Sequence, residues 1–245
     1  EPISASKLIV GMKCGGSDGF SGITANPLVG RFSDLLIGKG GTTILTEVPE
    51  MFGAETLLMN RCANRELFDE TVSLINDFKQ YFKDNHQTIY ENPSPGNKKG
   101  GISTLEDKSL GCTQKSGSAP VCGVLSYGEC VKTSGLNLLS APGNDLVAAT
   151  ALAASGAHIV LFTTGRGTPF ASPVPTVKIS SNSTLAGKKK NWIDFNAGVL
   201  VEDAELDTVG QQLFDYVIDV ASGRKVCSEE AGFHDMAIFK QGVTL

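Results

Sequence analysis

The 245-residue sequence has few of the residues on which many catalytic sites depend: it contains three histidines and one tryptophan. The histidines, His86, His158 and His234, are far apart, and none has a partner at a metal-ligand spacing. The sequence also lacks a GxGxxG fingerprint, a Walker loop and a GxSxG elbow. These absences argue against a histidine-centred zinc site and against a serine-hydrolase mechanism.

Positive charge and long apolar runs are scarce as well. Lysine and arginine number 21 against 26 acidic residues, which gives a net charge of -5, and the densest cationic run is Lys188–Lys190. No basic stripe of the kind that binds nucleic acid is present. No apolar stretch approaches the roughly 20 residues that a membrane span needs, and no secretory signal precedes the first strand. We therefore expect no nucleic-acid or membrane partner, and a cytoplasmic location.

Cysteines are moderately frequent but scattered, and no CxxC pair occurs. This pattern is weak support for a zinc knuckle and favours reduced thiols in a cytoplasmic protein. The sequence begins with Glu1, and a strand follows almost at once, so we expect a piece of a longer protein. The six cysteines are Cys14, Cys62, Cys112, Cys122, Cys130 and Cys227.

Short apolar runs alternate with helical patterns along most of the chain. The runs are rich in Ile, Val and Leu without clean alternation, which is typical of strands covered on both faces. The expected strands are Lys7–Met12, Thr43–Thr46, Leu136–Leu139, His158–Thr163 and Val174–Ile179. The expected helices are Pro27–Ile37, Arg65–Phe82, Asp145–Ala154 and Leu206–Val220, with apolar residues three and four apart in the second and fourth.

This alternation predicts an α/β fold: a mostly parallel sheet with helices on both faces. The stretch Asn85–Ser134 is rich in Gly, Ser, Lys and Pro and fits the pattern less well. We expect it to form an excursion over one edge of the sheet. No linker is long enough to divide the chain, so residues 1–245 are treated as one domain.

Three polar loops directly follow predicted strands: Cys14–Gly22, Ser140–Asp145 and Thr163–Pro169. Ligands of open parallel sheets bind at the carboxyl ends of the strands, so these loops are expected to share one rim. In the third loop, Arg166 lies between two glycines, where a guanidinium can hold a carboxylate or phosphate through two hydrogen bonds. Thr163, Thr164 and the backbone N–H of Gly165 can add donors.

The other two loops each have a functional and a structural interpretation. Cys14 and Asp18 can hold a cation or a sugar hydroxyl, or serve as a small buried residue and a turn residue. Asn144 or Asp145 is the expected N-cap of the following helix, whose N-terminus is also an anion site.

Two further segments carry candidate chemistry. The stiff loop Glu91–Gly101 contains the amides Asn92 and Asn97 and two lysines, Lys98 and Lys99. A desolvated lysine can act as a base, although a rigid surface turn explains the same residues. Just after the second strand, Glu47 and Glu50 are candidates for metal binding or acid/base catalysis, and Glu50 also suits a first helical turn.

Five of these motifs, in this order, closely resemble the altronate/galactarate dehydratase family, and altronate dehydratase in particular. The close of the chain, from WIDFNAG to AIFKQGVTL, fits too, so the resemblance covers essentially all 245 residues. The sulfolactate sulfo-lyase large subunit looks like a relative. The motifs are CGGSDGFSGITANP, TEVPEMFGAE, ENPSPGNKKGG, LNLLSAPGND and FTTGRGTP.

The resemblance implies the C-terminal half of a longer enzyme, with an N-terminal domain of the same chain as its partner. It implies a divalent metal, Fe²⁺ or Mn²⁺, and dehydration of D-altronate to 2-dehydro-3-deoxy-D-gluconate in hexuronate catabolism. Removing the C2 proton builds negative charge on the substrate carboxylate, and a metal or fixed cation must stabilise it.

The chain offers residues for each of these roles. We expect Lys98 or Lys99 as the base, with Glu47 also catalytic, and a carboxylate clamp in Arg166. Candidate metal ligands are Glu47, Glu50, Cys14 and Asp18; candidate substrate-binding residues are Arg166, Thr163, Thr164, Gly165, Asn92, Asn97, Asp18 and Asn144.

Other activities stay open at this point. Galactarate or a related sugar acid can replace altronate as substrate, and galactarate calls for a second cationic clamp. A non-catalytic sugar-acid-binding domain needs only Arg166 and helix N-termini. A domain that mainly builds a homo-oligomer is the third alternative.

Overall fold

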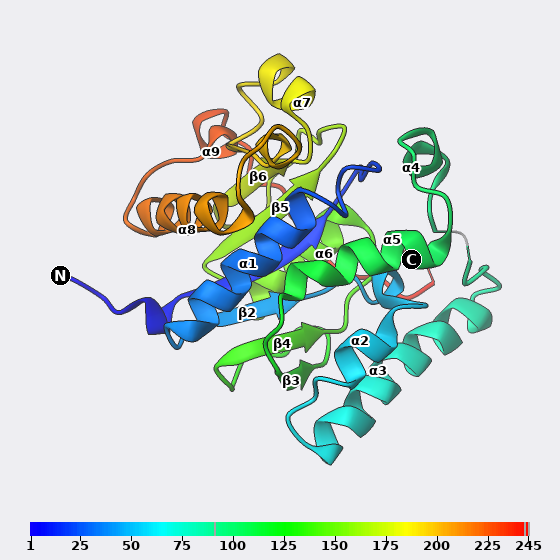
Figure 1. Ribbon diagram of the computed structural model, residues 1–245. Coiled ribbons are helices and arrows are strands. Elements are labelled where there is room, and N and C mark those ends of the chain that lie inside the picture. Colours follow the sequence, from blue (N-terminus) through cyan, green and yellow to red (C-terminus); the bar gives the residue numbers. More distant parts are fainter. Residues whose placement is uncertain (91, 243, 245) are drawn as a thin grey trace.

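The computed structural model describes residues 1–90, 92–242 and 244, and within them one sheet of seven parallel strands forms the centre of the molecule (Figure 1). The strand order is β3-β4-β2-β1-β5-β6-β7. The strands are β1 (Ile9–Cys14), β2 (Thr42–Leu45), β3 (Val121–Leu125), β4 (Gly135–Leu139), β5 (Ile159–Thr164), β6 (Thr176–Ser180) and β7 (Phe195–Asn196).

Strand β1 lies in the middle of this sheet. Its Val10 is in register with Thr43 of β2 on one side and with Ile159 of β5 on the other. The chain builds the sheet toward β3 first and then returns to add β5, β6 and β7. The direction of winding therefore changes between β1 and β5, and such a switch point opens a crevice at the carboxyl ends of the strands.

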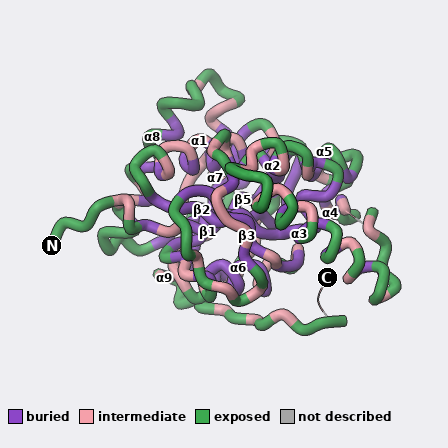
Figure 2. Tube along the Cα trace, turned by 90° about the horizontal axis from the view of Figure 1, so that it is seen from below, coloured by how far each residue is buried: buried purple, intermediate pink, exposed green. Residues whose placement is uncertain are grey.

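Helices cover both faces of the sheet, which confirms the predicted α/β architecture. Helices α1, α3 and α8 bury their apolar sides on one face, and α6 packs on the other through small residues and Leu152. Figure 2 shows the buried strands at the centre. The helices are α1 (Ala25–Gly38), α2 (Glu55–Met59), α3 (Arg65–Asp84), α4 (Pro95–Lys99), α5 (Leu105–Thr113), α6 (Asp145–Ala154), α7 (Ser183–Lys188), α8 (Leu206–Ala221) and α9 (Cys227–Glu230).

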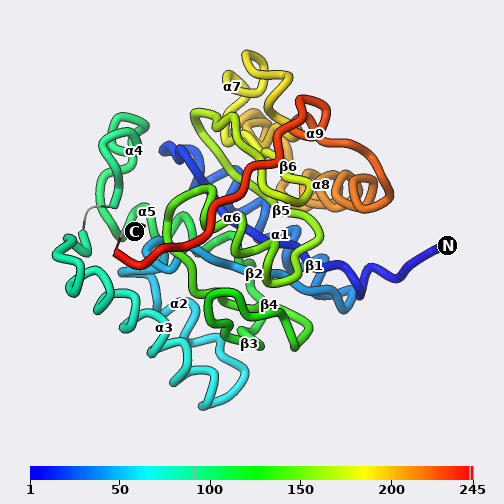
Figure 3. The backbone as a smooth tube through the Cα atoms, turned by 180° about the vertical axis from the view of Figure 1, so that it is seen from behind, coloured from blue at the N-terminus to red at the C-terminus, as the bar shows by residue number. Residues whose placement is uncertain are grey.

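Short 3₁₀ helices and one extended segment complete the fold. The segment after α9 crosses the α6 side of the sheet, drawn in red in Figure 3. There the Ala237 N–H donates to Thr150 of α6, and the Phe239 N–H donates to the Tyr127 hydroxyl. The 3₁₀ helices are η1 (Ala5–Lys7), η2 (Val48–Met51), η3 (Gln114–Ser116) and η4 (Gly198–Val201).

Each predicted strand and helix is present, with ends shifted by at most two residues. The description of Asn85–Ser134 as an excursion is wrong in one respect, because this stretch supplies the edge strand β3 in addition to α4 and α5. The short β7 was also not predicted. Among the described residues, no helix combines the length and apolar character needed to cross a membrane.

Candidate active site

A cavity of about 410 Å³ lies at the carboxyl edge of the sheet, next to the switch point. Loops after β1, β2, β4 and β5 contribute to its wall, and α4 and α5 close it from the side. The three strand-end loops that were expected to share one rim therefore do so.

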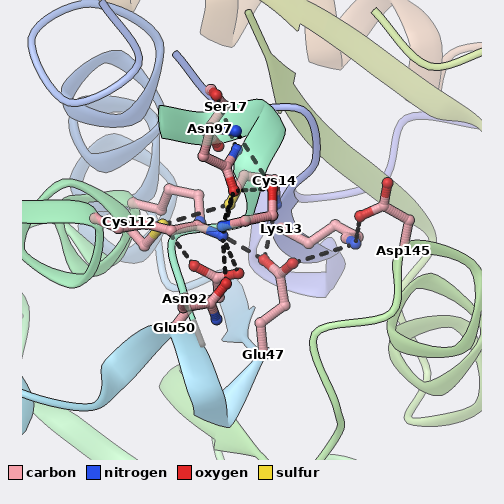
Figure 4. A network of polar contacts seen from close by, with 12 residues as sticks. Lys13, Cys14, Ser17, Glu47, Glu50, Asn92, Asn97, Cys112 and Asp145 are labelled. Carbon is pink, nitrogen blue, oxygen red and sulfur yellow. Dashed lines mark hydrogen bonds and ion pairs between the residues drawn. The ribbon is translucent and has the colours of Figure 1, made fainter. Parts of the chain in front are cut away.

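A buried network of charged side chains lies next to this cavity (Figure 4). Lys13, near the end of β1, is fully buried, and its Nζ lies 2.8 Å from Asp145 Oδ1 and 3.2 Å from Glu47 Oε1. The other carboxylate oxygen of Glu47 accepts the Cys14 N–H at 2.8 Å and lies 3.7 Å from Lys115 Nζ. Glu47 thus joins two buried lysines.

A second part of the network surrounds Lys108 of α5. Its Nζ lies 2.8 Å from Glu50 Oε1 and donates to the side-chain oxygens of Asn92 at 3.0 Å and Asn97 at 3.2 Å. The Asn97 amide in turn donates to the Ser17 carbonyl at 2.9 Å. Lys108 therefore connects α4, α5 and η2 at the cavity wall.

Two thiols lie between these parts of the network. The sulfurs of Cys14 and Cys112 are 3.5 Å apart, and Cys112 Sγ donates to Glu50 Oε2 at 3.3 Å. The ligand atoms of Cys14, Glu50 and Cys112 all lie within 4.8 Å of one another, and the three residues are buried. Two thiols and a carboxylate are a donor set that a divalent transition metal can bind.

The lysines of the network are held in their charged form. Burial alone would lower the pKa of Lys13, but Glu47 and Asp145 outweigh it and raise this pKa above its ordinary value. Burial also acts to lower the pKa of Lys108, but nearby Glu50 outweighs it and raises this pKa. For Lys115, burial is outweighed by Cys112 and Cys14 together with Glu47, which raise its pKa. All three ammonium groups therefore stay protonated at neutral pH.

The two thiols differ from each other in acidity. The hydrogen bond with Cys112 lowers the pKa of Cys14 against the effect of burial, and nearby Lys115 acts in the same direction. The same hydrogen bond, together with burial, raises the pKa of Cys112. Cys14 is thus the sulfur that more readily carries negative charge.

Glu47 has an unusual backbone conformation. Its φ is 66° and its ψ is 64°, in the left-handed region that costs a non-glycine residue about 1–2 kcal/mol. Residues held in such conformations cluster at functional sites, because the surrounding contacts must hold them in place. Here the contacts are the bonds of the Glu47 carboxylate to Lys13, Lys115 and the Cys14 N–H.

The structure brings together many of the residues that the sequence singled out. Arg166 is exposed on the cavity wall and makes no hydrogen bond to the part of the chain that the structure describes. Its guanidinium lies against α4, where a Cβ at Gly96 would collide with it. Asn144 lines the cavity and caps α6 by accepting the Val147 N–H. The predicted residues at the cavity wall are Cys14, Glu50, Asn92, Asn97, Asn144 and Arg166.

Other predicted residues lie outside the cavity wall. Asp18 accepts hydrogen bonds from the Ser21 N–H and hydroxyl, from Ser181 and from Asn182, so it fixes the loop after β1. It does not lie in the thiol cluster. A Cβ at Gly165 would collide with the Asp18 carboxylate, which explains the glycine there.

The two threonines and two lysines are placed as follows. Thr163 Oγ1 donates to Asn26 Oδ1 and so joins β5 to α1, and Thr164 Oγ1 accepts the Gly167 N–H and so fixes the loop after β5. Lys98 and Lys99 are exposed and do not line the cavity. Glu91, the first residue of their loop, lies outside the described residues.

Sequence reasoning missed four members of the network. Lys13 was assigned no role, because it falls between the predicted strand Lys7–Met12 and the loop Cys14–Gly22. Lys108, Cys112 and Lys115 belong to the stretch interpreted as an excursion. The last three are four and three residues apart, which places polar groups on one side of a helix. This spacing of polar residues between Gly-rich segments is the feature of the sequence that could have indicated their place in the site.

Buried, balanced charges beside a polar cavity at a switch point are typical of α/β enzymes. The family model described as "D-galactarate/Altronate dehydratase, C-terminal" matches residues 5–244. The chain belongs to this family, as the resemblance of its motifs predicted.

Several curated proteins match the whole chain. It is 65% identical to an altronate dehydratase of Bacillus subtilis and 61% identical to one of Escherichia coli, in each case over 100% of this chain and 50% of the relative. A galactarate dehydratase (L-threo-forming) of Escherichia coli is 41% identical over 98% of this chain and 46% of the relative. The chain thus spans about half the length of these relatives.

Proposed function

We propose that this chain is the C-terminal catalytic-type domain of a hydro-lyase that dehydrates D-altronate to 2-dehydro-3-deoxy-D-gluconate. The identities of 65% and 61% to altronate dehydratases, against 41% to a galactarate dehydratase, favour altronate as the substrate. The observation that carries the proposal is the set of buried lysines, each paired with a carboxylate, beside a cavity whose wall includes Arg166. The partner that completes the enzyme is the N-terminal part of the same chain.

The reaction needs fixed positive charge where the substrate carboxylate becomes an ene-diolate. Arg166 makes no hydrogen bond to the described residues and can bind that carboxylate through two hydrogen bonds. Lys108 lines the same cavity and retains its proton, so it stabilises developing negative charge. Asn92 and Asn97 hold Lys108 in position and offer amide groups to substrate hydroxyls.

A different group must take the C2 proton, because protonated lysines cannot accept it. The exposed positions of Lys98 and Lys99 do not favour them for this role. Asp145 lines the cavity, is 34% exposed, and is held by Lys13 at 2.8 Å. We assign the base to Asp145, with Lys13 and Glu47 as residues that position it.

The cluster of Cys14, Glu50 and Cys112 fits a divalent metal, and its ligand atoms favour one of the two expected metals, Fe²⁺ and Mn²⁺. Thiolate sulfur favours Fe²⁺, whereas Mn²⁺ prefers oxygen ligands, so Cys14, Glu50 and Cys112 support Fe²⁺. Cys14, Glu50 and Cys112 would hold the ion, and both thiols would lose their protons to bind it as thiolates. When bound, the metal supplies Lewis-acid polarisation of a substrate oxygen.

Galactarate is the second candidate substrate, and the cavity gives a reason to rank it lower. A dicarboxylate needs a cation at each end. Among the described residues at the cavity wall, the two cations are Arg166 and Lys108, and Lys108 is already paired with Glu50. Both cations are already assigned to the carboxylate that becomes the ene-diolate, so neither of them remains for a second carboxylate.

The test measures kcat/KM for D-altronate and galactarate with the full-length enzyme, loaded with Fe²⁺, and with its Arg166→Ala and Arg166→Lys variants. We expect the wild type to prefer altronate and Arg166→Ala to raise KM by at least tenfold, with partial recovery in Arg166→Lys. Lys188→Ala, at an exposed lysine of α7, is the matched control. Preference for galactarate, or an unchanged KM in Arg166→Ala, would contradict the assignment.

A further inference from the structure

Cys14 and Cys112 form a pair of sulfurs that the fold brings together from distant parts of the sequence. Cys14 ends the central strand β1, and Cys112 lies 98 residues later in α5, yet their sulfurs are 3.5 Å apart. Both residues are buried, with 2% and 3% exposure. Among the described residues, none of the other four cysteines has a sulfur within hydrogen-bonding distance of another sulfur.

Small molecules can approach this pair from two sides. Cys14 lines the cavity of about 410 Å³ described above. Cys112 lines a second cavity of about 180 Å³, which lies between the loop after β1 and helix α5 and is also lined by Lys108 and Ile23. The volumes on both sides accommodate a molecule as small as hydrogen peroxide.

We propose that Cys14 and Cys112 are a reversible modification site, which a hydroperoxide converts to a disulfide, and that disulfide formation and metal binding exclude each other. Only the exclusion between disulfide and metal rests on the proposed function, which assigns a metal to these residues. Disulfide formation itself follows from the positions of the two sulfurs.

The chemistry balances with hydrogen peroxide as the oxidant. The Cys14 sulfur attacks one peroxide oxygen, the O–O bond breaks, and water leaves as sulfenic acid forms. The Cys112 sulfur then attacks the Cys14 sulfur, the S–O bond breaks, and a second water leaves. Two thiols are oxidised by two electrons and one peroxide is reduced to two waters.

Only a small movement is required for this product. A disulfide bond is about 2.05 Å long, so the sulfurs must approach by about 1.5 Å from their present 3.5 Å. The approach breaks the hydrogen bond that Cys112 Sγ now donates to Glu50 Oε2. The product has no thiolate left at either sulfur, so two of the three donors of the cluster are lost to a metal.

The test uses the chain freed of metal with a chelator and then treated with hydrogen peroxide. We expect the thiols titrated after unfolding to fall from six to four and to return to six with dithiothreitol. Peptide mapping without reduction should show the Cys14–Cys112 linkage. Saturation with Zn²⁺, which is redox-inert, should slow formation of this linkage at least tenfold.

Two variants serve as matched controls. Cys112→Ser should abolish the linkage, and Cys227→Ser, at a cysteine of α9 away from the cluster, should leave it unchanged. Wild-type protein that keeps six thiols, or that forms a disulfide between other cysteines, would overturn the proposal, whether or not Cys112→Ser folds. Equal rates with and without Zn²⁺ would refute the exclusion between metal and disulfide. No substrate is used, so a failure to dehydrate altronate leaves this result unaffected.

Discussion

Replacing Lys108 by methionine tests whether the charge network is as desolvated as the structure shows. Lys108 is 8% exposed, and its partner Glu50 is 7% exposed, with 2.8 Å between the charged atoms. Methionine keeps most of the side-chain volume but removes the ammonium group. The variant therefore leaves a buried carboxylate without its cation, which typically costs 3–5 kcal/mol.

The pH sets an upper limit on this cost. A buried carboxylate that loses its cation can take up a proton, so its destabilising effect cannot exceed the cost of protonation. For an ordinary glutamate at pH 7 this cost is about 3.7 kcal/mol. At pH 5 the same step costs about 1 kcal/mol. We therefore expect Lys108→Met to lower the free energy of unfolding by about 3–4 kcal/mol at pH 7 and by about 1–2 kcal/mol at pH 5.

Urea unfolding followed by circular dichroism at both pH values measures this difference. Lys98→Met, at an exposed lysine of α4, is the matched control and should change stability by less than about 0.5 kcal/mol. Adding Glu50→Gln to Lys108→Met should recover part of the loss, because the unpaired charge is removed. A loss below about 1 kcal/mol at pH 7, or a loss equal at both pH values, would refute the reasoning.

Two further predictions concern residues outside the cavity. Burial lowers the pKa of Lys178 in β6 to about 8, against attraction from Asp194. Between pH 8 and 10.5 the unfolded chain therefore binds more protons than the folded one, so Lys178 makes the free energy of unfolding rise with pH in this range. Lys178→Met should remove this rise and should stabilise the protein at pH 7 on the order of 1–2 kcal/mol. Urea titrations in which the variant shows the same rise with pH as the wild type would contradict the prediction. Asp18→Ala should lower the free energy of unfolding by about 3 kcal/mol, because it abolishes four hydrogen bonds in a buried loop. A decrease of less than about 1 kcal/mol would show that the loop does not depend on these hydrogen bonds.

The sequence contained most of the information about the central sheet. Runs such as Val10–Met12 and Val160–Phe162 are apolar throughout because both faces of their strands are covered. Strand β3 escaped prediction because it lies at the edge, where three of its five residues are only half buried, and because Gly123 interrupts its apolar pattern. An edge strand leaves a weaker signal in composition than a central one.

The candidate site was predictable where it depends on strand ends. Cys14 is the last residue of β1 and Glu47 lies two residues beyond the end of β2, so their place at the carboxyl rim follows from the parallel sheet. Lys108 and Cys112 could not be placed in this way, because their position depends on how residues 85–134 fold back over the rim. Their contribution required the tertiary structure.

The lysines Lys98 and Lys99 show how local geometry decides which side chain faces the cavity. The preceding residue, Asn97, is the third residue of α4 and makes a capping box with Ser94, and its amide points into the network. Successive residues of a helix are rotated by about 100°, so Lys98 and Lys99 leave that face and remain exposed. The same motif thus contributes amides to the cavity and lysines to the surface.

The central position of β1 has a consequence for how the chain reaches this structure. β1 must wait for β5, which begins at Ile159, before its second edge is paired. Contacts between such distant segments close large loops, and sheets built from them fold slowly, over milliseconds to seconds. During synthesis, more than half of the chain must leave the ribosome while one edge of β1, including Lys13 and Cys14, has no neighbour. Chaperones that shield unpaired strand edges are therefore most useful in the interval between the synthesis of β1 and that of β5.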